Sequence, residues 1–527
     1  MKLHNALVSV YEKTRIIELA KNLLIVNISI ISTDGTYKFL FDFGINTINI
    51  NKYLGYFETL EGRIKTIHPK IYYGILANRK KNKQLFFLKK QNIRLIDILV
   101  INLYPFNRII KELNCKMENA IDNIDIGGTS MIRSGAKNYG SFKKGVIVLI
   151  DSKDYKKFIL NINKYCVFNF YVFKLSLSYK AYSYTSYYDN SISFFLNKLI
   201  NFNKNKSKNF WPNNIYLKLQ LYKNLRYGEN PHQKSAIYIL KKEINKEPAL
   251  YKQINGKNMS YNNVCDSESA LKFVSDFSKN TCVIFKHGNP CGASSNKYIK
   301  KAYYKSIKSD PVSLFGGIIA FNVKINYDFA KIIINNFFEI IIAPSYEEKA
   351  LKVLSKRKNI IILIYYKSNI LHRNIEIKKI NEFWLTQIKN NNFKNEFDMD
   401  VVTKIFPRKK NIESLNFAWN IIKYVKSNAI VIVKNNMILG IGTGQMSRID
   451  SSIIAISKAK KFNLDLKNSI ASSDAFFPFN DAFELLIKAC VKNFVQPGGS
   501  NNDKKIVSIA NKNFVSMIFT GIRYFSH

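Results

Sequence analysis

The 527-residue sequence contains few cysteines and no long apolar run, and each shortage excludes a class of protein. Its six cysteines are scattered, without the C-x-x-C spacing of a common zinc site or the density of a disulfide scaffold. We therefore expect no metal. The start, MKLHNALVSVYEKT, has no uninterrupted apolar segment of the signal-peptide kind, and the longest apolar runs are too short to cross a bilayer. We expect a soluble, cytoplasmic protein with no membrane partner.

Acidic residues are also scarce, since 37 Asp and Glu stand against 81 Lys and Arg, a formal net charge of +44. Such an excess can indicate a nucleic-acid partner. The lysines are scattered, however, and Lys, Asn, Ile, Tyr and Phe are frequent everywhere, as an AT-rich coding sequence would produce. We interpret the charge as compositional bias and expect no nucleic acid. A basic RNA-binding protein on an old enzyme scaffold is the alternative from another class.

The length predicts two or more domains, and the 47% apolar content predicts that they are folded. The first part alternates apparent strands (NALVSV, ISIIST, LIDILVINLYPF) with helical stretches, which is typical of a parallel α/β domain. An aromatic-rich stretch, LSLSYKAYSYTSYYDNSISFFLNKLI, suits a helix whose aromatic side chains pack in a core. The polar segment NFNKNKSKNFWPNN follows it, and we place the domain boundary there, between residues 1–200 and 201–527.

Two turns in the first part follow predicted strands and precede predicted helices: SVYEKT and STDGT. Backbone N–H groups at a helix start, together with Ser or Thr hydroxyls, can hold a phosphate, and Lys13 could add charge. Ordinary helix capping by Ser9, Thr14, Ser32 or Thr36 explains either turn alone equally well. Two such turns in one domain favour phosphate binding.

Three further segments of the first part carry polar side chains. GRIKTIHPK places Arg63 and Lys65 on one face of an extended chain, which suits an anionic substrate or a solvated loop. NLYPF places Tyr104 at a strand end, and IDIGGTSMIRSGAKN joins Asp125 to Lys137 through a helix. A carboxylate, a lysine and a tyrosine near one phosphate site could perform acid–base chemistry.

In the second part, FKHGNPCGAS places Lys286 and His287 side by side at the end of a predicted strand. Neighbouring strand residues point to opposite faces, so both can serve one site only if the strand ends there and the chain turns. The residues that follow are turn formers. A solvated Lys-His pair is the alternative. A zinc deaminase is excluded, because no second cysteine follows PCGAS and no H-x-E precedes it.

Eleven motifs occur in an order that resembles one enzyme family: GRIKTIHPK, NLYPF, IDIGGTSMIRSGAKN, LRYGENPHQ, SYNN, KHGNPCG, DPVSLFGGIIAFN, IIAPSYEE, GIGTGQMSR, SSDAFFPF and QPGGS. It is the bifunctional purine-biosynthesis family that joins phosphoribosylaminoimidazolecarboxamide (AICAR) formyltransferase to IMP cyclohydrolase, and the resemblance covers nearly the whole chain. It implies a methylglyoxal-synthase-like cyclohydrolase domain, then a formyltransferase domain of two cytidine-deaminase-like subdomains. It further implies a homodimer, 10-formyltetrahydrofolate as co-substrate, and AICAR, formyl-AICAR and IMP as ligands.

For the formyltransferase half, the resemblance implies that His287 assists deprotonation of the AICAR amine and that Asn428 orients the catalytic groups. Lys286 would stabilise the oxyanion or help protonate the leaving nitrogen of the folate. The implied AICAR-binding residues are Arg226, Tyr227, Asn263, Glu339, Arg523 and Phe525. The implied folate-binding residues are Phe315, Arg448, Phe476 and Pro478.

For the cyclohydrolase half, the resemblance implies a catalytic cluster of Lys65, Tyr104, Asp125 and Lys137. The implied substrate-binding residues are Ser9, Lys13, Thr14, Arg63 and Thr66.

The cyclohydrolase half departs from the family pattern at several positions. Asp34 replaces a glycine in the second phosphate turn, Tyr11 and Glu12 alter the first, and Tyr72 and Tyr73 replace a His-Gly pair. Near GRIKT, YFETLE replaces the family's FPE. A formyltransferase with an impaired cyclohydrolase domain is therefore an alternative hypothesis.

Overall fold

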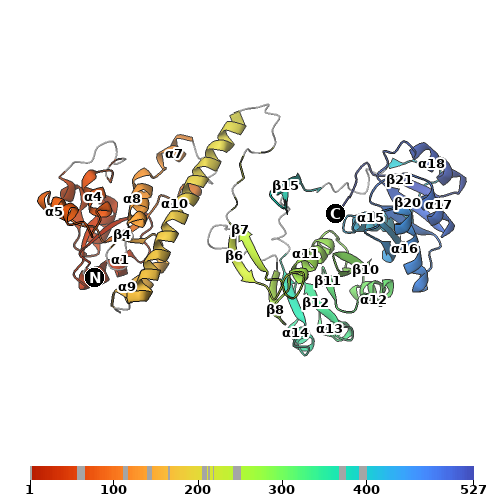
Figure 1. The fold of residues 1–527 in the computed structure, drawn as a ribbon. Helices are drawn as coiled ribbons and strands as arrows, with labels where there is room; N and C mark the ends of the chain where they lie inside the picture. Colours follow the sequence, from red (N-terminus) through yellow and green to blue (C-terminus); the bar gives the residue numbers. More distant parts are fainter. Residues whose placement is uncertain are drawn as a thin grey trace. The chain divides into compact units, whose positions relative to one another are not determined.

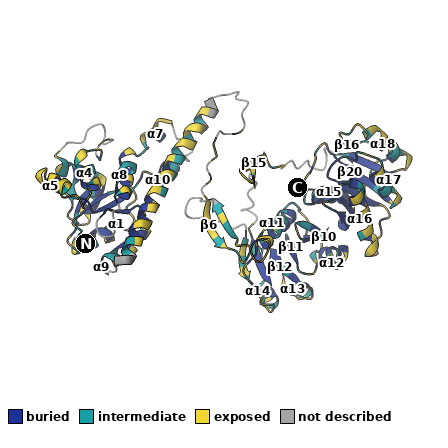
Figure 2. Cartoon of the chain, viewed as in Figure 1, coloured by how far each residue is buried: buried dark blue, intermediate teal, exposed yellow. Residues whose placement is uncertain are grey.

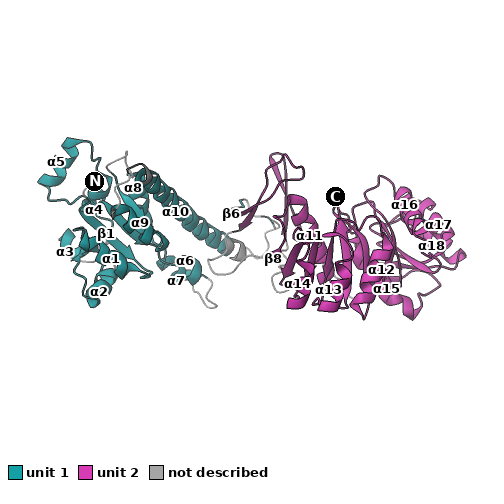
Figure 3. Ribbon diagram, turned by 90° about the horizontal axis from the view of Figure 1, so that it is seen from below, with its two compact units in different colours: residues 1–218 teal, residues 219–527 magenta. Residues whose placement is uncertain are grey.

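The computed structural model describes residues 3–55, 64, 66–110, 117–138, 145–163, 167–203, 211, 214–215, 217, 219–240, 251–366, 375–390 and 400–527. The chain forms two compact units, Met1–Lys218 and Leu219–His527 (Figure 3). The boundary predicted at residues 200 and 201 lies within helix α10 (Val167–Asn203), and the compact units divide further along the chain. None of the described helices is both long enough and apolar enough to cross a membrane.

Unit 1 is built on a parallel sheet of five strands in the order β3-β2-β1-β4-β5. Its strands are β1 (Asn5–Val10), β2 (Ser29–Ser32), β3 (Ile48–Asn49), β4 (Ile98–Asn102) and β5 (Ile147–Leu149). Its helices are α1 (Ile16–Ile25), α2 (Asp34–Asp42), α3 (Ile50–Leu54), α4 (Pro69–Leu76), α5 (Asn82–Lys90), α6 (Phe106–Ile109), α7 (Met117–Asp122), α8 (Ile126–Lys137), α9 (Lys153–Asn163) and α10. The predicted parallel α/β domain is confirmed.

Helices cover both faces of this sheet, so its central strands are apolar on both sides. In β4, Ile98 and Val100 point into a core shared with α1 and α9, whereas Leu99 and Ile101 point into a core shared with α4 and α8. Helix α10 contributes to both cores, and its buried side lies along the sheet while its far end is exposed (Figures 1 and 2). The aromatic stretch predicted to be core therefore buries part of its length.

Unit 2 contains a sheet of twelve strands in the order β16-β21-β20-β19-β17-β18-β10-β9-β11-β12-β13-β8. Its first-half strands are β8 (Tyr251–Asn255), β9 (Thr281–Lys286), β10 (Asn289–Ser295), β11 (Gly317–Phe321), β12 (Phe338–Ala343) and β13 (Ile361–Tyr365). Its second-half strands are β16 (Asp400–Val401), β17 (Ile430–Lys434), β18 (Met437–Gly442), β19 (Ser469–Ser473), β20 (Val491–Gln496) and β21 (Ser516–Phe519). Two smaller sheets pair β6 (Leu219–Asn224) with β7 (Ala236–Leu240), and β14 (Ile375–Ile380) with β15 (Phe383–Ile388).

The twelve-stranded sheet consists of two copies of one six-stranded structural repeat. From its centre outward, β10-β9-β11-β12-β13-β8 and β18-β17-β19-β20-β21-β16 follow the same sequence of antiparallel, antiparallel, parallel, parallel and antiparallel pairs. The repeats meet where β10 pairs antiparallel with β18, at Ser294 and Met437. This duplication accords with the two similar subdomains that the resemblance implies.

The helices repeat as well. Helices α11 (Tyr261–Ser275) and α15 (Lys409–Ile422) pack in one core on one face of the sheet. The other face is covered by α12 (Ile299–Ser309), α13 (Tyr327–Ile333) and α14 (Glu348–Leu354) in the first repeat, and by α16 (Arg448–Lys461), α17 (Asp481–Lys488) and α18 (Asp503–Lys512) in the second. Matching glycines allow the close packing: a Cβ on Gly292 would lie 2.2 Å from Ser306 O, and one on Gly440 would lie 2.0 Å from Ala455 O.

Candidate active sites

The Lys-His pair of unit 2 lies on a tight hairpin. Strand β9 ends at Lys286, which pairs with Asn289 at the start of β10. His287 (φ 53°) and Gly288 (φ 75°) form the two-residue connection. Positive φ at both positions is the mark of a type I′ turn, whose twist matches that of the flanking strands. The strand therefore ends, and the chain turns, where the sequence predicted.

The ammonium group of Lys286 lies beside an exposed aromatic wall. Its Nζ donates a hydrogen bond to the carbonyl oxygen of Phe315 at 2.8 Å. The ring of Phe315 is 64% exposed and lies 4.9 Å, centroid to centroid, from that of Phe337. The Lys286 ammonium is therefore fixed to the backbone of the residue that carries this exposed ring.

A carboxylate from helix α11 holds the turn from behind. Asp266 accepts hydrogen bonds from the backbone N–H of His287 at 3.1 Å and of Gly288 at 2.8 Å. Burial raises the pKa of Asp266, and the two N–H donors partly oppose this shift. No local sequence pattern predicts this contact, because the partners are 21 and 22 residues apart.

The same hairpin is tied to the second repeat through Asn289. Its Oδ1 accepts hydrogen bonds from the backbone N–H of Lys426 at 3.1 Å and from Thr443 Oγ1 at 2.8 Å. Lys426 precedes Asn428 by two residues. Asn289 is thus a direct link between the turn that carries His287 and the segment that carries Asn428.

Asn428 and Arg448 belong to one buried network. Asn428 Nδ2 donates to the carbonyl oxygens of Gln445 and Met446, and its Oδ1 accepts from Arg448 Nη2 at 3.2 Å. Arg448 is only 9% exposed and pairs with Asp474 Oδ1 at 2.7 Å, with Asp474 fully buried. These bonds and that from Nη1 to the Phe476 carbonyl engage both terminal nitrogens of the Arg448 guanidinium with protein acceptors.

The C-terminal segment packs beside this network. The guanidinium of Arg523 lies 4.6 Å from the ring centroid of Phe476, whose carbonyl oxygen accepts from Arg448 Nη1 at 3.1 Å. Ser427 N donates to Ser526 O at 3.0 Å, so the segment that carries the exposed Phe525 runs along the approach to Asn428. Pro478 lies nearby in sequence, and its carbonyl oxygen accepts from Asn502.

A third group surrounds Glu339 on β12. Arg226 Nη2 lies 3.7 Å and Lys257 Nζ 3.0 Å from Glu339 Oε1, and the Arg226 guanidinium stacks on the Tyr227 ring at 4.6 Å. These half-exposed charges suit a polar ligand, and Lys257 was missed by the sequence analysis because no motif contains it.

Asn263 differs from the other predicted AICAR-binding residues because its side chain belongs to a helix cap. Its Oδ1 accepts from Ser260 N at 3.0 Å, and its own N–H donates to Ser260 Oγ, which completes a capping box at the start of α11. Asn263 is therefore buried at the base of the helix that carries Asp266.

In unit 1 the two predicted phosphate turns lie side by side at the carboxyl ends of β1 and β2, where ligands of α/β sheets bind. Lys13 Nζ donates to Thr36 Oγ1 at 3.1 Å and to Val10 O, and Thr33 Oγ1 donates to Ser9 Oγ at 3.3 Å. Burial lowers the pKa of Lys13. Thr14 Oγ1, in the same turn, donates to Glu12 Oε1 at 2.8 Å.

Asp34, the acidic replacement in the second turn, is held by amide donors. Its carboxylate accepts from Asn49 Nδ2 at 2.7 Å and from Asn51 Nδ2 at 3.1 Å. Asp34 also begins α2, where a negative charge is favoured by the helix dipole. The fold therefore accommodates this carboxylate with bonds of its own.

Tyr104 and Asp125 belong to elements that pack on each other, because Tyr104 follows strand β4 and Asp125 caps helix α8. Asp125 caps α8 by accepting from Gly128 N at 2.6 Å, and a Cβ on Gly128 would lie 2.7 Å from Leu103 Cδ2. Tyr104 follows Leu103, is half-exposed, and lies edge-on to Tyr11 with centroids 5.4 Å apart. Tyr11, one of the departures from the family pattern, thus contacts the predicted catalytic tyrosine.

Lys137 is the last residue of helix α8, at the end opposite to the Asp125 cap. Helix α8 has twelve residues from Ile126 to Lys137, and a rise of 1.5 Å per residue places its ends about 18 Å apart. Asp125 and Lys137 therefore lie at opposite ends of one helix, and their joint role in ring closure stays a prediction. Arg63 and Lys65 lie outside the described residues. Thr66 is buried against Gly127.

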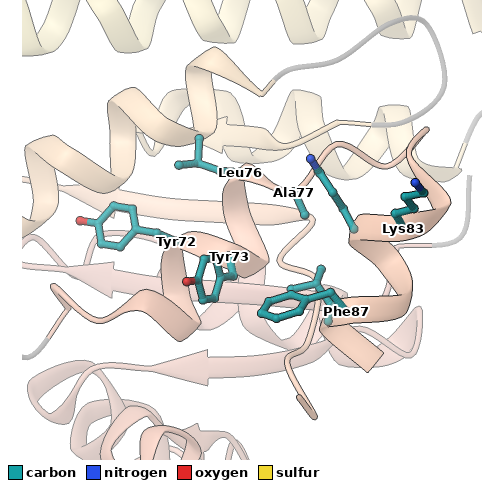
Figure 4. Close-up of a pocket in the computed structure, with 8 residues that line it drawn as sticks. Tyr72, Tyr73, Leu76, Ala77, Lys83 and Phe87 are labelled. Carbon is teal, nitrogen blue, oxygen red and sulfur yellow. The ribbon is translucent and has the colours of Figure 1, made fainter. Parts of the chain in front are cut away.

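A cavity of about 530 Å³ lies between α4 and α5 (Figure 4). Its lining is mostly apolar and aromatic: Tyr72, Tyr73, Leu76, Ala77, Lys83, Gln84, Phe87 and Leu88. It contains none of the predicted site residues. Tyr72 and Tyr73 both line this cavity, and Tyr72 also lies within the influence of Asp125: burial is the main cause that raises the Tyr72 pKa, and the Asp125 charge adds to it. In the described part of the chain, no cluster of three or more His, Cys, Asp or Glu could hold a metal ion.

Comparison with known proteins gives matches over the whole chain. The family described as "AICARFT/IMPCHase bienzyme" matches residues 135–458, and that described as "MGS-like domain" matches residues 15–130, which confirms the methylglyoxal-synthase-like fold expected at the N-terminus. A crystal structure titled "Crystal structure of ForH" covers 36% of this chain and 97% of its own, at 28% identity and a TM-score of 0.32.

Three relatives are each named "Bifunctional purine biosynthesis protein PurH". That of Caldicellulosiruptor saccharolyticus is 43% identical, over 99% of both chains. Those of Buchnera aphidicola subsp. Schizaphis graminum and Wigglesworthia glossinidia brevipalpis are 41% and 42% identical, over 99% of this chain and 98% of theirs. The chain therefore belongs to the AICARFT/IMPCHase bienzyme family.

Proposed function

We propose that the chain catalyses the last two steps of IMP synthesis: formyl transfer from 10-formyltetrahydrofolate to AICAR, and dehydrative closure of formyl-AICAR to IMP. The observation that carries this function is the end-to-end correspondence with bifunctional relatives, 99% of both chains at 43% identity. Both units are present, and each retains a polar site at the loops that the family motifs occupy.

In formyl transfer, the AICAR amine attacks the formyl carbon, the bond from that carbon to the folate nitrogen breaks, and tetrahydrofolate leaves. We assign His287 to accept the amine proton and Lys286 to stabilise the oxyanion of the tetrahedral intermediate. A positioned base contributes about 10²–10⁴-fold, and a cation at the oxyanion a comparable factor. The folate nitrogen takes up a proton as it leaves.

The surrounding groups are assigned by their chemistry. The exposed ring of Phe315 suits the flat pterin, and the backbone carbonyl of the same residue binds the Lys286 ammonium. Arg226, Tyr227 and Glu339, together with Arg523 and Phe525 at the C-terminus, supply the charged and aromatic contacts for AICAR. We assign Arg448 to hold Asn428 and the Phe476 carbonyl in place, rather than to bind the folate tail directly.

In ring closure, the carboxamide nitrogen attacks the formyl carbon and the formyl oxygen leaves as water. We assign Asp125 to take the amide proton and Tyr104 to assist the departing oxygen; the packing of α8 on β4 supports this assignment, because Asp125 caps α8 and Tyr104 follows β4. The turns with Ser9, Lys13 and Thr14 and the buried Thr66 would bind the substrate phosphate. Arg63 and Lys65 are further candidates from the sequence.

The test measures the two reactions separately in wild type and in Lys286→Ala and His287→Ala. The matched control is Lys434→Ala, since Lys434 occupies the position of Lys286 in the second repeat. We expect both turn variants to lose formyl transfer by at least about 100-fold, to close supplied formyl-AICAR normally, and the control to retain both activities. Absence of formyl transfer in the wild type would overturn the proposal.

The same assay separates the alternatives. A wild type that makes formyl-AICAR but no IMP would support the impaired-cyclohydrolase hypothesis, and the Asp34 carboxylate would then be the first suspect. The RNA-binding alternative requires tight binding with a steep salt dependence in the absence of both activities. We also propose that the enzyme is a homodimer, which light scattering after size-exclusion chromatography would test.

A further inference from the structure

We propose that Asp266 is a positioning residue for formyl transfer, which fixes the turn bearing His287 through its two backbone hydrogen bonds. This inference rests on the proposed function of the turn. It concerns a residue that does not itself contact the reacting atoms, and that acts by holding the base in place.

The contact is a bidentate clamp. Asp266 lies on α11, and its two carboxylate oxygens accept separately from His287 N at 3.1 Å and from Gly288 N at 2.8 Å. Hydrogen bonds to an ionised acceptor are roughly twice as strong as neutral ones. Both central residues of the turn are therefore fixed to the helix behind it.

The turn needs such support because His287 is in an unfavourable conformation. Its φ of 53° lies in the left-handed region, which non-glycine residues rarely adopt. A base must also lie within about 0.5 Å of its productive position for efficient proton transfer. The clamp fixes the backbone position of His287 and leaves its imidazole side chain available to a substrate.

The second repeat provides an internal control. Its equivalent turn, Asn435 and Asn436, has φ values of 51° and 54°, and the residue equivalent to Asp266 is Ser414 on α15. Ser414 Oγ accepts from Asn436 N at 3.1 Å and donates to Asn436 Oδ1 at 2.7 Å. In this hairpin a neutral acceptor thus holds one backbone N–H, and Asn436 Nδ2 also donates to Glu413 Oε1. The carboxylate of the first repeat instead holds both backbone N–H groups of its turn.

Helix α11 also connects the clamp to the proposed substrate site. Its N-terminal cap contains Asn263, and the helix packs against the sheet that carries Glu339. Beside burial, which is the main cause of the raised pKa of Asp266, the charge of His287 lowers this pKa and that of Glu339 raises it. A single rigid helix thus sets the turn and the AICAR contacts relative to one another.

The test compares Asp266→Ala, Asp266→Ser and Asp266→Asn with the control Ser414→Ala in the full-length chain. We expect Asp266→Ala to lower kcat for formyl transfer by about 10–100-fold, because displacement of a catalytic group by about 1 Å can cost 10²-fold. The KM for AICAR should change by less than about threefold. Asp266→Ser, which copies the second repeat, and Asp266→Asn should each recover part of the loss. Ser414→Ala should leave kcat unchanged.

Ring closure of supplied formyl-AICAR and the thermal midpoint provide independent readouts of folding. Wild-type kcat in folded Asp266→Ala would overturn the inference, as would equal kcat losses in Asp266→Ala and Ser414→Ala. If Asp266→Ala fails to fold, Asp266→Ser decides: undiminished kcat in that variant would refute the need for the second acceptor. A wild type without formyl transfer would instead refute the proposed function, so the two failures are distinguishable.

Discussion

Replacement of Asp474 by Asn should destabilise unit 2 and impair formyl transfer together. The Asp474 carboxylate is fully buried and is contacted by the Arg448 guanidinium at 2.7 Å and by Ser427 Oγ at 2.6 Å. The substitution keeps the shape of the side chain but leaves the guanidinium cation buried without a counter-charge. Breaking a buried ion pair in this way typically costs about 3–5 kcal/mol.

That cost can be converted into a shift of the thermal midpoint. With an unfolding entropy of about 2.1 cal/mol/K per residue, a unit of this size should lose roughly 5–8 °C in Tm. Because Arg448 Nη2 also donates to Asn428 Oδ1, a displaced guanidinium should lower kcat for formyl transfer by about tenfold. Ring closure should be unchanged, since the residues proposed for it lie in unit 1.

The assay is the loss of each activity on heating, together with kcat and KM for both substrates at 25 °C. The matched control is Asp465→Asn, which removes the acceptor of another ion pair of the same repeat, Lys434–Asp465, whose carboxylate is 70% exposed. The control should leave the midpoint unchanged. The reasoning is refuted if Asp474→Asn retains the wild-type midpoint, or if its only defect is a raised KM for the folate, as a direct contact of Arg448 with the folate tail would predict.

Three further predictions concern unit 1. Burial lowers the pKa of Lys174 from 10.5 to about 8, so folding releases the Lys174 proton at pH values between these two. The free energy of unfolding should therefore rise by about 3 kcal/mol from pH 8 to 10.5. Denaturant titrations of Lys174→Met should show this rise abolished, and an identical rise in both proteins would contradict the assignment. Gly128→Ala should abolish ring closure, because its Cβ would lie 2.5 Å from Asp125 Oδ2. The control Gly135→Ala, on the same helix, should cost about 1–3 kcal/mol of stability and retain ring closure in the folded protein. Equal ring-closure activities of the two variants would exclude a special role for the helix start. Asp34→Gly should not increase the rate of ring closure, because the Asp34 carboxylate is already bound by amide donors. A several-fold gain in IMP formation would show instead that this carboxylate hinders binding of the substrate phosphate.

Local sequence patterns were sufficient to predict the strands and turns that carry the candidate sites. The run ILVIN at residues 98–102 is apolar at successive positions because helices cover both faces of the unit 1 sheet, and that pattern predicts a parallel α/β domain. The turn at His287 and Gly288 was equally visible, because a tight hairpin requires residues that tolerate positive φ. Motif order along the chain was enough to indicate the family.

Partners from distant segments could not be predicted in this way. Asn289 is held by groups 137 and 154 residues away, and Asp266 was hidden because a carboxylate within a helix has no distinctive local pattern. The equivalence of Lys286 with Lys434 is likewise visible only in the sheet order, since the residues that follow each lysine differ.

The sequence by itself thus determined the strands, the turns and the chemical groups available at them, because periodicity and backbone preference act over a few residues. Only the tertiary structure decided which of those groups meet. It separated Lys137 from Asp125 along one helix, committed Arg448 to the buried Asp474, and placed Asp266 behind His287. The physical reason is that a side chain's partners are fixed by the packing of whole helices on sheets, which joins segments that no local pattern connects.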